Sequence, residues 1–196
     1  MSTARNEPNA DASGGILYPL AVSLLVVGLL LGFALLPRIF RQHESSPLAG
    51  KTIPDFTLPV IANGGGLPKD ADGNVPKTTA VSALKGKVVI LDFWATWCGP
   101  CNAEAPILDQ VAKKYADRGL IVVGVSQDSD PITPTRWTKA KGVSYPMMFD
   151  DQRTADRFGI DGLPTMIVLD RDGVVRAVRV GVTQKSELED LAEKYL

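Results

Sequence analysis

The chain has 196 residues, a formal net charge of −1 at pH 7 and 45% hydrophobic residues. This length fits one globular domain with a short appendage. The near-balance of charge leaves no basic stripe of the kind that binds nucleic acid, so nucleic acid is not an expected partner.

The N-terminal quarter divides into a polar tail, an apolar span and a polar linker. Residues 1–15 are polar, and we expect a disordered tail. Residues 16–36 carry no charge, and a helix over them would be about 31 Å long, the thickness of a bilayer's hydrocarbon core. We therefore predict a single transmembrane helix over 16–36, a linker over 37–51 and one domain over 52–196.

A cleaved signal peptide is the alternative for the apolar span. Its apolar region would be only about 7–15 residues long, with small residues at the cleavage site. The span here is longer, and Pro37-Arg38-Ile39-Phe40-Arg41 follows it, which favours an uncleaved anchor. Two arginines, Arg38 and Arg41, follow the span, and only Arg5 precedes it. By the positive-inside rule this bias would place the domain in the cytoplasm.

Residues 52–196 show alternating strand and helix patterns. Strands are predicted at residues 53–60, Val75–Val81, Lys87–Trp94, Leu120–Ser126, Pro146–Phe149, Thr165–Leu169 and Val174–Val180. Helices are predicted from the first cysteine to about Arg118, around Trp137, over Gln152–Phe158 and over Gln184–Tyr195. The order βαβα followed by ββα predicts an α/β domain with a central mixed β-sheet flanked by helices.

The only two cysteines, Cys98 and Cys101, stand where a buried strand meets a helix. Free N–H groups and the dipole at a helix start favour a thiolate, whose pKa in such motifs falls from about 8.5 to about 3.5–7.5. Pro100 fits the first helical turn because it has no N–H to leave unpaired. We predict that Cys98 is the nucleophile and that Cys101 is the less exposed, resolving cysteine.

Two other interpretations of the cysteine pair are weaker. Structural zinc needs about four ligands, and the chain adds only the distant His43, so no metal site is expected. An inert pair of small buried side chains is the other alternative.

The segment Phe93–Cys101 resembles the active-site segment of the thioredoxin superfamily. The wider pattern resembles its membrane-anchored TlpA/ResA/CcmG-like branch, through Pro54–Leu58, Leu84–Val89, Cys101–Pro106, Gly124–Asp128, Gly162–Thr165 and Asp170–Gly173. This resemblance covers about residues 51–196. It implies a thioredoxin-like fold and thiol–disulfide exchange through a redox-active disulfide, with no bound cofactor.

The resemblance also implies roles for two acids. Asp92 would be a buried carboxylate, its pKa raised by desolvation, that moves protons to or from Cys101. The alternative is an acid that reaches solvent at the strand end. Thioredoxins place a lysine near this acid, whereas the aligned strand here has Gly124. Glu104 recurs in the anchored branch, and complementing the helix dipole is its alternative role.

The expected substrate contacts lie on both sides of the cysteines. Pro164 would be a cis-proline facing them, which leaves the backbone of Leu163 free to pair with an extended peptide. Trp97, Gly99 and Pro100 complete the set, with surface cover as the alternative role for Trp97.

The Gly-Pro dipeptide between the cysteines is that of thioredoxin, so we expect a reductase of protein disulfides. The resemblance implies a catalytic domain in the periplasm, anchored in the inner membrane, against the charge bias; we follow it because long domains translocate largely regardless of charge. Such a reductase needs a membrane thiol-relay protein as electron donor. Members of this branch commonly serve cytochrome c or copper-oxidase assembly.

Two rival functions remain. A membrane-tethered Cu(I) carrier or chaperone would use the two sulfurs as soft ligands, although no Met or His lies near the motif in sequence. A thiol peroxidase is the other, but the Pro-x-x-x-Thr-x-x-Cys signature of peroxiredoxins is missing and Thr96 stands without the rest of it.

Overall fold

The computed structural model describes residues 22–30, 32 and 46–196. The predicted tail, the rest of the predicted span and most of the predicted linker lie outside the described residues. Residues 22–30 are helical. Within the described segments, no helix is both long enough and apolar enough to cross a membrane. The compact unit that carries the cysteines is Ser45–Leu196.

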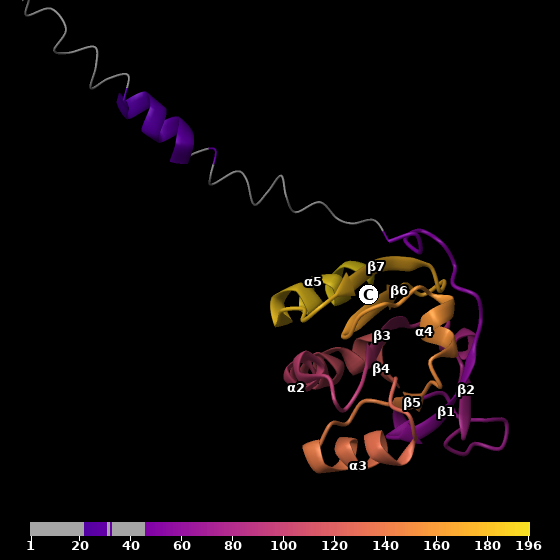
Figure 1. Cartoon of the computed structure of the whole chain (residues 1–196). Helices are drawn as coiled ribbons and strands as arrows, with labels where there is room; N and C mark the ends of the chain where they lie inside the picture. Colours follow the sequence, from indigo (N-terminus) through magenta and orange to yellow (C-terminus); the bar gives the residue numbers. More distant parts are fainter. Residues whose placement is uncertain (1–21, 31, 33–45) are drawn as a thin grey trace, which may run out of the picture. The chain divides into compact units, whose positions relative to one another are not determined.

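This unit is built on one seven-stranded sheet in the order β2-β1-β5-β4-β3-β6-β7 (Figure 1). The strands are β1 (Thr57–Ala62), β2 (Thr78–Ala80), β3 (Val88–Trp94), β4 (Leu120–Ser126), β5 (Met147–Phe149), β6 (Thr165–Leu169) and β7 (Val175–Val180). The β3–β4 and β4–β5 pairs are parallel, and the other pairs are antiparallel. The predicted mixed sheet is therefore confirmed.

Helices cover both faces of the sheet. They are α2 (Gly99–Tyr115), α3 (Ile132–Lys141), α4 (Arg153–Arg157) and α5 (Lys185–Tyr195), with 3-10 turns η1 (Gly64–Gly66), η2 (Val81–Leu84) and η3 (Ala116–Arg118). Figure 1 shows α2 and α5 on one side of the sheet and α4 on the other. The helix predicted to end near Arg118 runs to Tyr115 and continues as η3.

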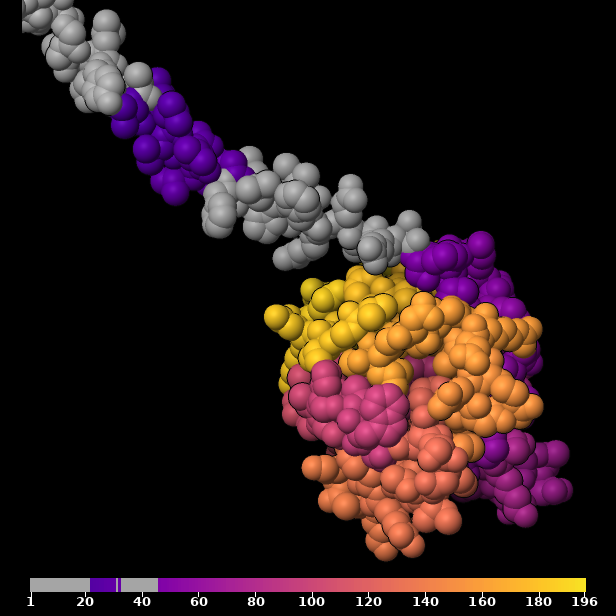
Figure 2. Space-filling model, viewed as in Figure 1, coloured from indigo at the N-terminus to yellow at the C-terminus, as the bar shows by residue number. Residues whose placement is uncertain are grey.

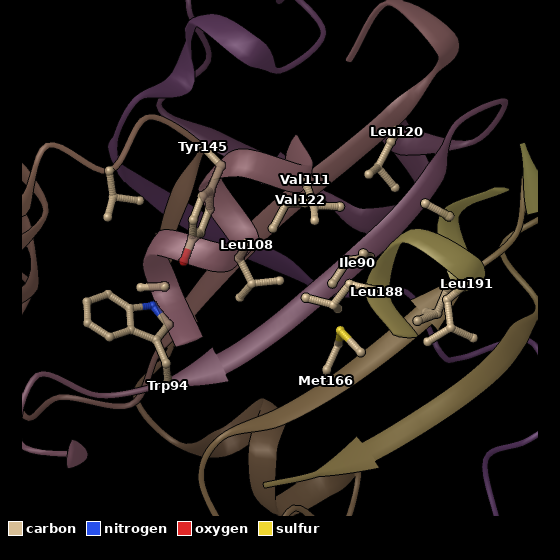
Figure 3. Close-up of a cluster of buried hydrophobic side chains, with 14 of the residues drawn as sticks. Ile90, Trp94, Leu108, Val111, Leu120, Val122, Tyr145, Met166, Leu188 and Leu191 are labelled. Atoms are coloured by element: carbon tan, nitrogen blue, oxygen red, sulfur yellow. The ribbon is translucent and has the colours of Figure 1, made fainter. Parts of the chain in front are cut away.

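The central strand β3 is buried along its whole length, and its side chains alternate between two apolar clusters. Val88 and Ile90 pack into the cluster that includes side chains of α2 and α5, part of which Figure 3 shows. Val89, Leu91 and Phe93 pack into the cluster that includes side chains of α4. The same alternation directs Asp92 to the α2 face. The carboxyl group therefore lies on the side of the sheet that carries the two cysteines.

The predicted strand Val75–Val81 is wrong in extent, because only Thr78–Ala80 forms β2. Val75 is 47% exposed, and Pro76 has no N–H to donate to a ladder. At the other end, the N–H of Val81 donates to the carbonyl of Phe56 and the chain turns into η2. The strand expected over 53–60 forms later, as β1 at Thr57–Ala62.

Candidate active site

Strand β3 and helix α2 position the cysteine pair. Cys98 is the N-cap residue of α2, and its Sγ accepts a hydrogen bond from the N–H of Cys101 at 3.2 Å. Cys98 and Cys101 are joined by a disulfide, so the structure shows the oxidised form. Their exposed fractions, 5% and 3%, differ little. A thiolate at Cys98 would keep the same N–H donor and the dipole of a 17-residue helix.

The loop between β3 and α2 is held by a buried carboxylate that sequence reasoning missed. Both Oδ atoms of Asp128 accept from the N–H of Thr96, at 3.1 and 3.3 Å, and Oδ1 also accepts from the Thr96 hydroxyl at 2.6 Å. Asn102 Nδ2 donates to the carbonyl of Thr96 at 3.2 Å. A recognisable signal existed: Asp128 follows β4, and the ends of neighbouring parallel strands meet at one edge of a sheet.

A groove of about 470 Å³ opens beside Cys98. Its lining comprises Trp97, Cys98, Pro100, Gln127, Gln152, Ala155, Asp156, Ile160, Asp161, Gly162 and Leu163. Figure 2 shows that α2, in rose, and α4, in orange, both reach the surface of the domain. Only one of the two cysteines lines the groove, so an incoming sulfur reaches Cys98 rather than Cys101.

The expected substrate contacts divide between this groove and its surroundings. Trp97, which is 71% exposed, lines the groove with Pro100 and Leu163. Gly99 is exposed but lies outside the lining, and Pro164 is buried. The Leu163–Pro164 peptide bond is cis, as the resemblance implies.

Asp92 is buried, 3% exposed, and the alternative that its side chain reaches solvent is wrong. Its Oδ2 accepts from the hydroxyl of Tyr145 at 3.5 Å, and its Oδ1 has no partner among the described residues. Desolvation raises the pKa of Asp92 well above its usual range, and the negative charge of Glu104 raises it further. The Tyr145 hydrogen bond lowers this pKa and only partly offsets the two effects.

Glu104 is also buried, 1% exposed, and lies beyond the first turn of α2. Its Oε1 accepts from the N–H of Thr183, in the loop between β7 and α5, at 2.7 Å. Burial raises the pKa of Glu104, and the Thr183 hydrogen bonds lower it. The side chain therefore ties α2 to the β7–α5 loop, which the dipole interpretation does not require.

Other polar groups at the site had no clear signal in the sequence. Gln127 is 5% exposed, donates to Asp150 Oδ2 at 3.3 Å, and leaves Oε1 without a partner in the described structure. Tyr145 comes from the loop before β5. Over residues 22–30, 32 and 46–196, no three His, Cys, Asp or Glu side chains form a group that could hold a metal ion.

The fold and the site together define a class of protein. A sheet with the parallel core β3–β4–β5 presents a Cys-x-x-Cys disulfide at the start of a helix, beside an open groove. A pair in this position exchanges electrons with another disulfide or dithiol through a mixed disulfide. The chain is thus a thioredoxin-like thiol–disulfide oxidoreductase.

Comparison with known proteins agrees with this class. Residues 48–194 match the Redoxin family, and the chain belongs to it. It is 31% identical over 168 residues to the thiol-disulfide oxidoreductase ResA of Bacillus subtilis strain 168, covering 85% of this chain and 86% of that protein. ResA of Bacillus anthracis is 29% identical over 174 residues, covering 88% and 92%.

A solved structure extends the comparison to three dimensions. A protein from Chlorobium tepidum assigned as the thiol:disulfide interchange protein DsbE superposes with a TM-score of 0.64 and is 31% identical. The match covers 75% of this chain and 96% of that one. The predicted thioredoxin-like, ResA/CcmG-like family and its enzyme class are therefore confirmed.

Proposed function

We propose that this protein reduces disulfides in other proteins outside the cytoplasm, with Cys98 as nucleophile and Cys101 as resolving cysteine. The observation that carries the proposal is the position of Cys98, which caps α2 and lines the groove. The Gly-Pro dipeptide and the similarity to ResA support the reducing direction.

The exchange requires two steps in the reduced protein. The Cys98 thiolate attacks one sulfur of the substrate disulfide, which forms a mixed disulfide and releases the other sulfur as a thiolate. Cys101 then loses its proton, attacks Cys98 Sγ and releases the second substrate sulfur. Asp92 is the proposed acceptor of that proton. The products are a substrate dithiol and the Cys98–Cys101 disulfide.

The groove favours an extended substrate segment. Leu163 lines it, and no backbone hydrogen bond of Leu163 is found in the described structure, so its backbone is available to a peptide. The charged side chains in the lining, Asp156 and Asp161, are both acidic and exposed. They would complement basic residues beside the substrate cysteine.

The proposal extends to a membrane setting. An anchor over 16–36 would hold the domain at the periplasmic face of the inner membrane, where cytosolic thiols cannot regenerate it directly. A membrane protein that relays thiol electrons would then reduce the Cys98–Cys101 disulfide. Cytochrome c or copper-oxidase assembly would supply the protein substrates.

Trapping the mixed disulfide tests the proposed function. Cys101→Ser should stop turnover and accumulate a covalent complex through Cys98, because resolution is lost. Cys98→Ser should stop reduction without any trapped species. Mass spectrometry of the complex would identify the substrate and show whether basic residues flank its cysteine.

Two results would contradict the assigned roles: faster alkylation of Cys101 than of Cys98 in the reduced protein, or disulfide reduction by both single variants. Stoichiometric Cu(I) binding without reductase activity would instead favour the carrier function.

A further inference from the structure

The side chain of Asp92 receives one hydrogen bond in the described structure, and its donor is Tyr145. The Tyr145 hydroxyl lies 3.5 Å from Asp92 Oδ2, and both residues are 3% exposed. Asp92 Oδ1 remains buried without a partner. A buried carboxylate depends on its few donors, and this hydroxyl is the group that opposes the two larger effects, burial and the charge of Glu104, which disfavour the ionised form of Asp92.

Tyr145 reaches Asp92 because β4 has no side chain at the position between them. Gly124 stands opposite Asp92 in the parallel β3–β4 pair. A Cβ on Gly124 would meet Met147 Sδ first, and it would also lie 2.9 Å from Trp94 Nε1 and 3.2 Å from Tyr145 Cε2. Figure 3 shows Trp94 and Tyr145 in one cluster, with the hydroxyl pointing into it. The side chains of Met147, Trp94 and Tyr145 thus share the space that a larger residue at 124 would take.

The backbone around Tyr145 is fixed from two sides. Asn63 Nδ2, after β1, donates to the carbonyls of Val143 and Tyr145 at 2.7 and 3.1 Å. Asp109 Oδ1, on α2, accepts from the N–H and the hydroxyl of Ser144, each at 2.7 Å. These bonds hold the loop before β5 at three successive residues, so the direction of the Tyr145 side chain is built into the fold.

The charged groups that face this pair are acidic. Glu104, on α2, raises the pKa of Asp92, while the flanking Gly124 on β4 and Met166 on β6 carry no charge. Burial, the charge of Asp92 and two acids of α2, Asp109 and Glu104, raise the pKa of Tyr145 well above its usual range. Tyr145 is therefore a neutral donor at physiological pH. Within the described chain, no lysine or arginine contributes to the pKa of Asp92.

We propose that Tyr145 is a positioning residue for the exchange reaction: its hydroxyl orients the Asp92 carboxylate and favours the ionised form that accepts the proton of Cys101. The inference rests on the proposed role of Asp92. In the resolving step the S–H bond of Cys101 breaks, Asp92 takes the proton, the new thiolate bonds to Cys98 Sγ, and the substrate sulfur leaves with the electron pair.

Tyr145→Phe removes the hydroxyl and keeps the ring, so it tests the inference in the full chain. The pKa of Asp92, followed by the ¹³Cγ shift in the oxidised protein, should rise because its charged form loses a donor. The acidic limb of the pH profile for resolution should move to higher pH in parallel. At pH values on that acidic limb, the resolving step should slow about three- to tenfold, while the first attack by Cys98 is unchanged.

Tyr115→Phe is the matched control. Tyr115 is 1% exposed, and its hydroxyl donates to Glu193 at 2.8 Å, a residue of α5. This substitution should leave both the Asp92 titration and the resolution profile unchanged. In an Asp92→Asn background, Tyr145→Phe should produce no further slowing of resolution.

The inference is overturned if Asp92 titrates in Tyr145→Phe as in the wild type, or if the titration moves and the resolution profile does not. The titration uses the oxidised protein and needs no turnover, so it separates a failure of this contact from a failure of the proposed function. Should Tyr145→Phe not fold, 3-fluorotyrosine at position 145 keeps the ring and donates more strongly. The pKa of Asp92 should then fall, and an unchanged titration would count against the inference.

Discussion

The burial of Asp92 costs the folded protein stability, because its environment disfavours the charged carboxylate. Its side chain is buried beside a second buried acid, Glu104, and one neutral hydroxyl is its donor. The pKa of Asp92 is raised in the folded state above the ordinary value of 3.8. Between those two pKa values the folded protein holds a proton that the unfolded chain has lost, so its stability falls as pH rises.

Asp92→Asn should therefore stabilise the oxidised protein, and the gain should grow with pH. We expect little difference below about pH 4, a rising advantage as pH increases toward the folded-state pKa, and a plateau above it. The plateau amounts to about 1.4 kcal/mol for each unit by which folding raises the pKa. Urea denaturation of oxidised wild type and variant across pH measures it. A difference that does not depend on pH would show that Asp92 titrates normally.

At the residue scale, the sequence predicts the positions of site residues that lie on or next to strand β3, and it misses contacts that come from distant loops. The apolar run before the cysteines and the helical pattern after them predict that Cys98 stands at a helix start, and strand alternation explains why Asp92 faces α2. Tyr145 is 53 residues from Asp92, and its contact depends on the empty position at Gly124. No local pattern encodes such a contact, because its cause is the packing of separate elements.

At the element scale, the loop between β3 and α2 leads to Cys98 and lies outside both elements, so its backbone lacks the hydrogen bonds of a strand or a helix. Asp128 supplies the partners that a strand or helix would otherwise provide, since it accepts from both the N–H and the hydroxyl of Thr96. Ser126 also donates to Asp128 Oδ2, at 2.9 Å. The end of β4 thus fixes the loop that delivers the nucleophile.

Thr96→Val removes the hydroxyl bond of this loop and nearly preserves the shape of the side chain. We expect a loss of about 1–3 kcal/mol in stability, because a hydrogen bond to a carboxylate is lost, and slower alkylation of reduced Cys98. Chemical denaturation and timed alkylation measure the two effects.

Thr79→Val is the matched control for that substitution. Thr79 is 5% exposed, and its hydroxyl has no partner in the described structure, so its replacement should be neutral or slightly stabilising. Equal stability losses in the two variants would show that the Asp128 bond contributes nothing specific.

The elements themselves were predictable to different degrees. The apolar run before Trp94 and the run Leu120–Ser126 predicted two central strands closely, since strands buried on both faces need continuous apolar sequence. The short edge strand β2 was overestimated, because Pro76 and exposed Val75 share its extended pattern without pairing. The length of an edge strand depends on how many of its residues pair with the neighbouring strand, and the sequence alone does not give this register.

At the scale of the whole molecule, several ordered motifs predict the fold class, while the proposed cellular setting rests on the predicted span 16–36. The unit Ser45–Leu196 has its own sheet and two apolar clusters. Near its start, the N–H of Gly50 donates to the carbonyl of Val175, and Thr52 bridges to Val174, so the chain enters beside β7. Its first residues and its groove therefore involve different elements of this unit.

The full chain should stay with membranes after a carbonate wash, because an uncharged span of this length is stable in a bilayer. A chain that starts at Ser45 should be recovered in the soluble fraction and retain thiol–disulfide exchange, which makes it the control. Recovery of the full chain as a soluble species with a new N-terminus between 36 and 50 would indicate a cleaved signal.

A reporter fused after Leu196 decides the sidedness that the sequence leaves in conflict. Alkaline phosphatase at this position should be active, because it needs disulfides that form outside the cytoplasm. An inactive phosphatase, together with a fluorescent cytoplasmic reporter at the same site, would show that Arg38 and Arg41 set the orientation. The domain would then meet cytosolic thiols directly, and no membrane relay would be needed to return Cys98 and Cys101 to the reduced state.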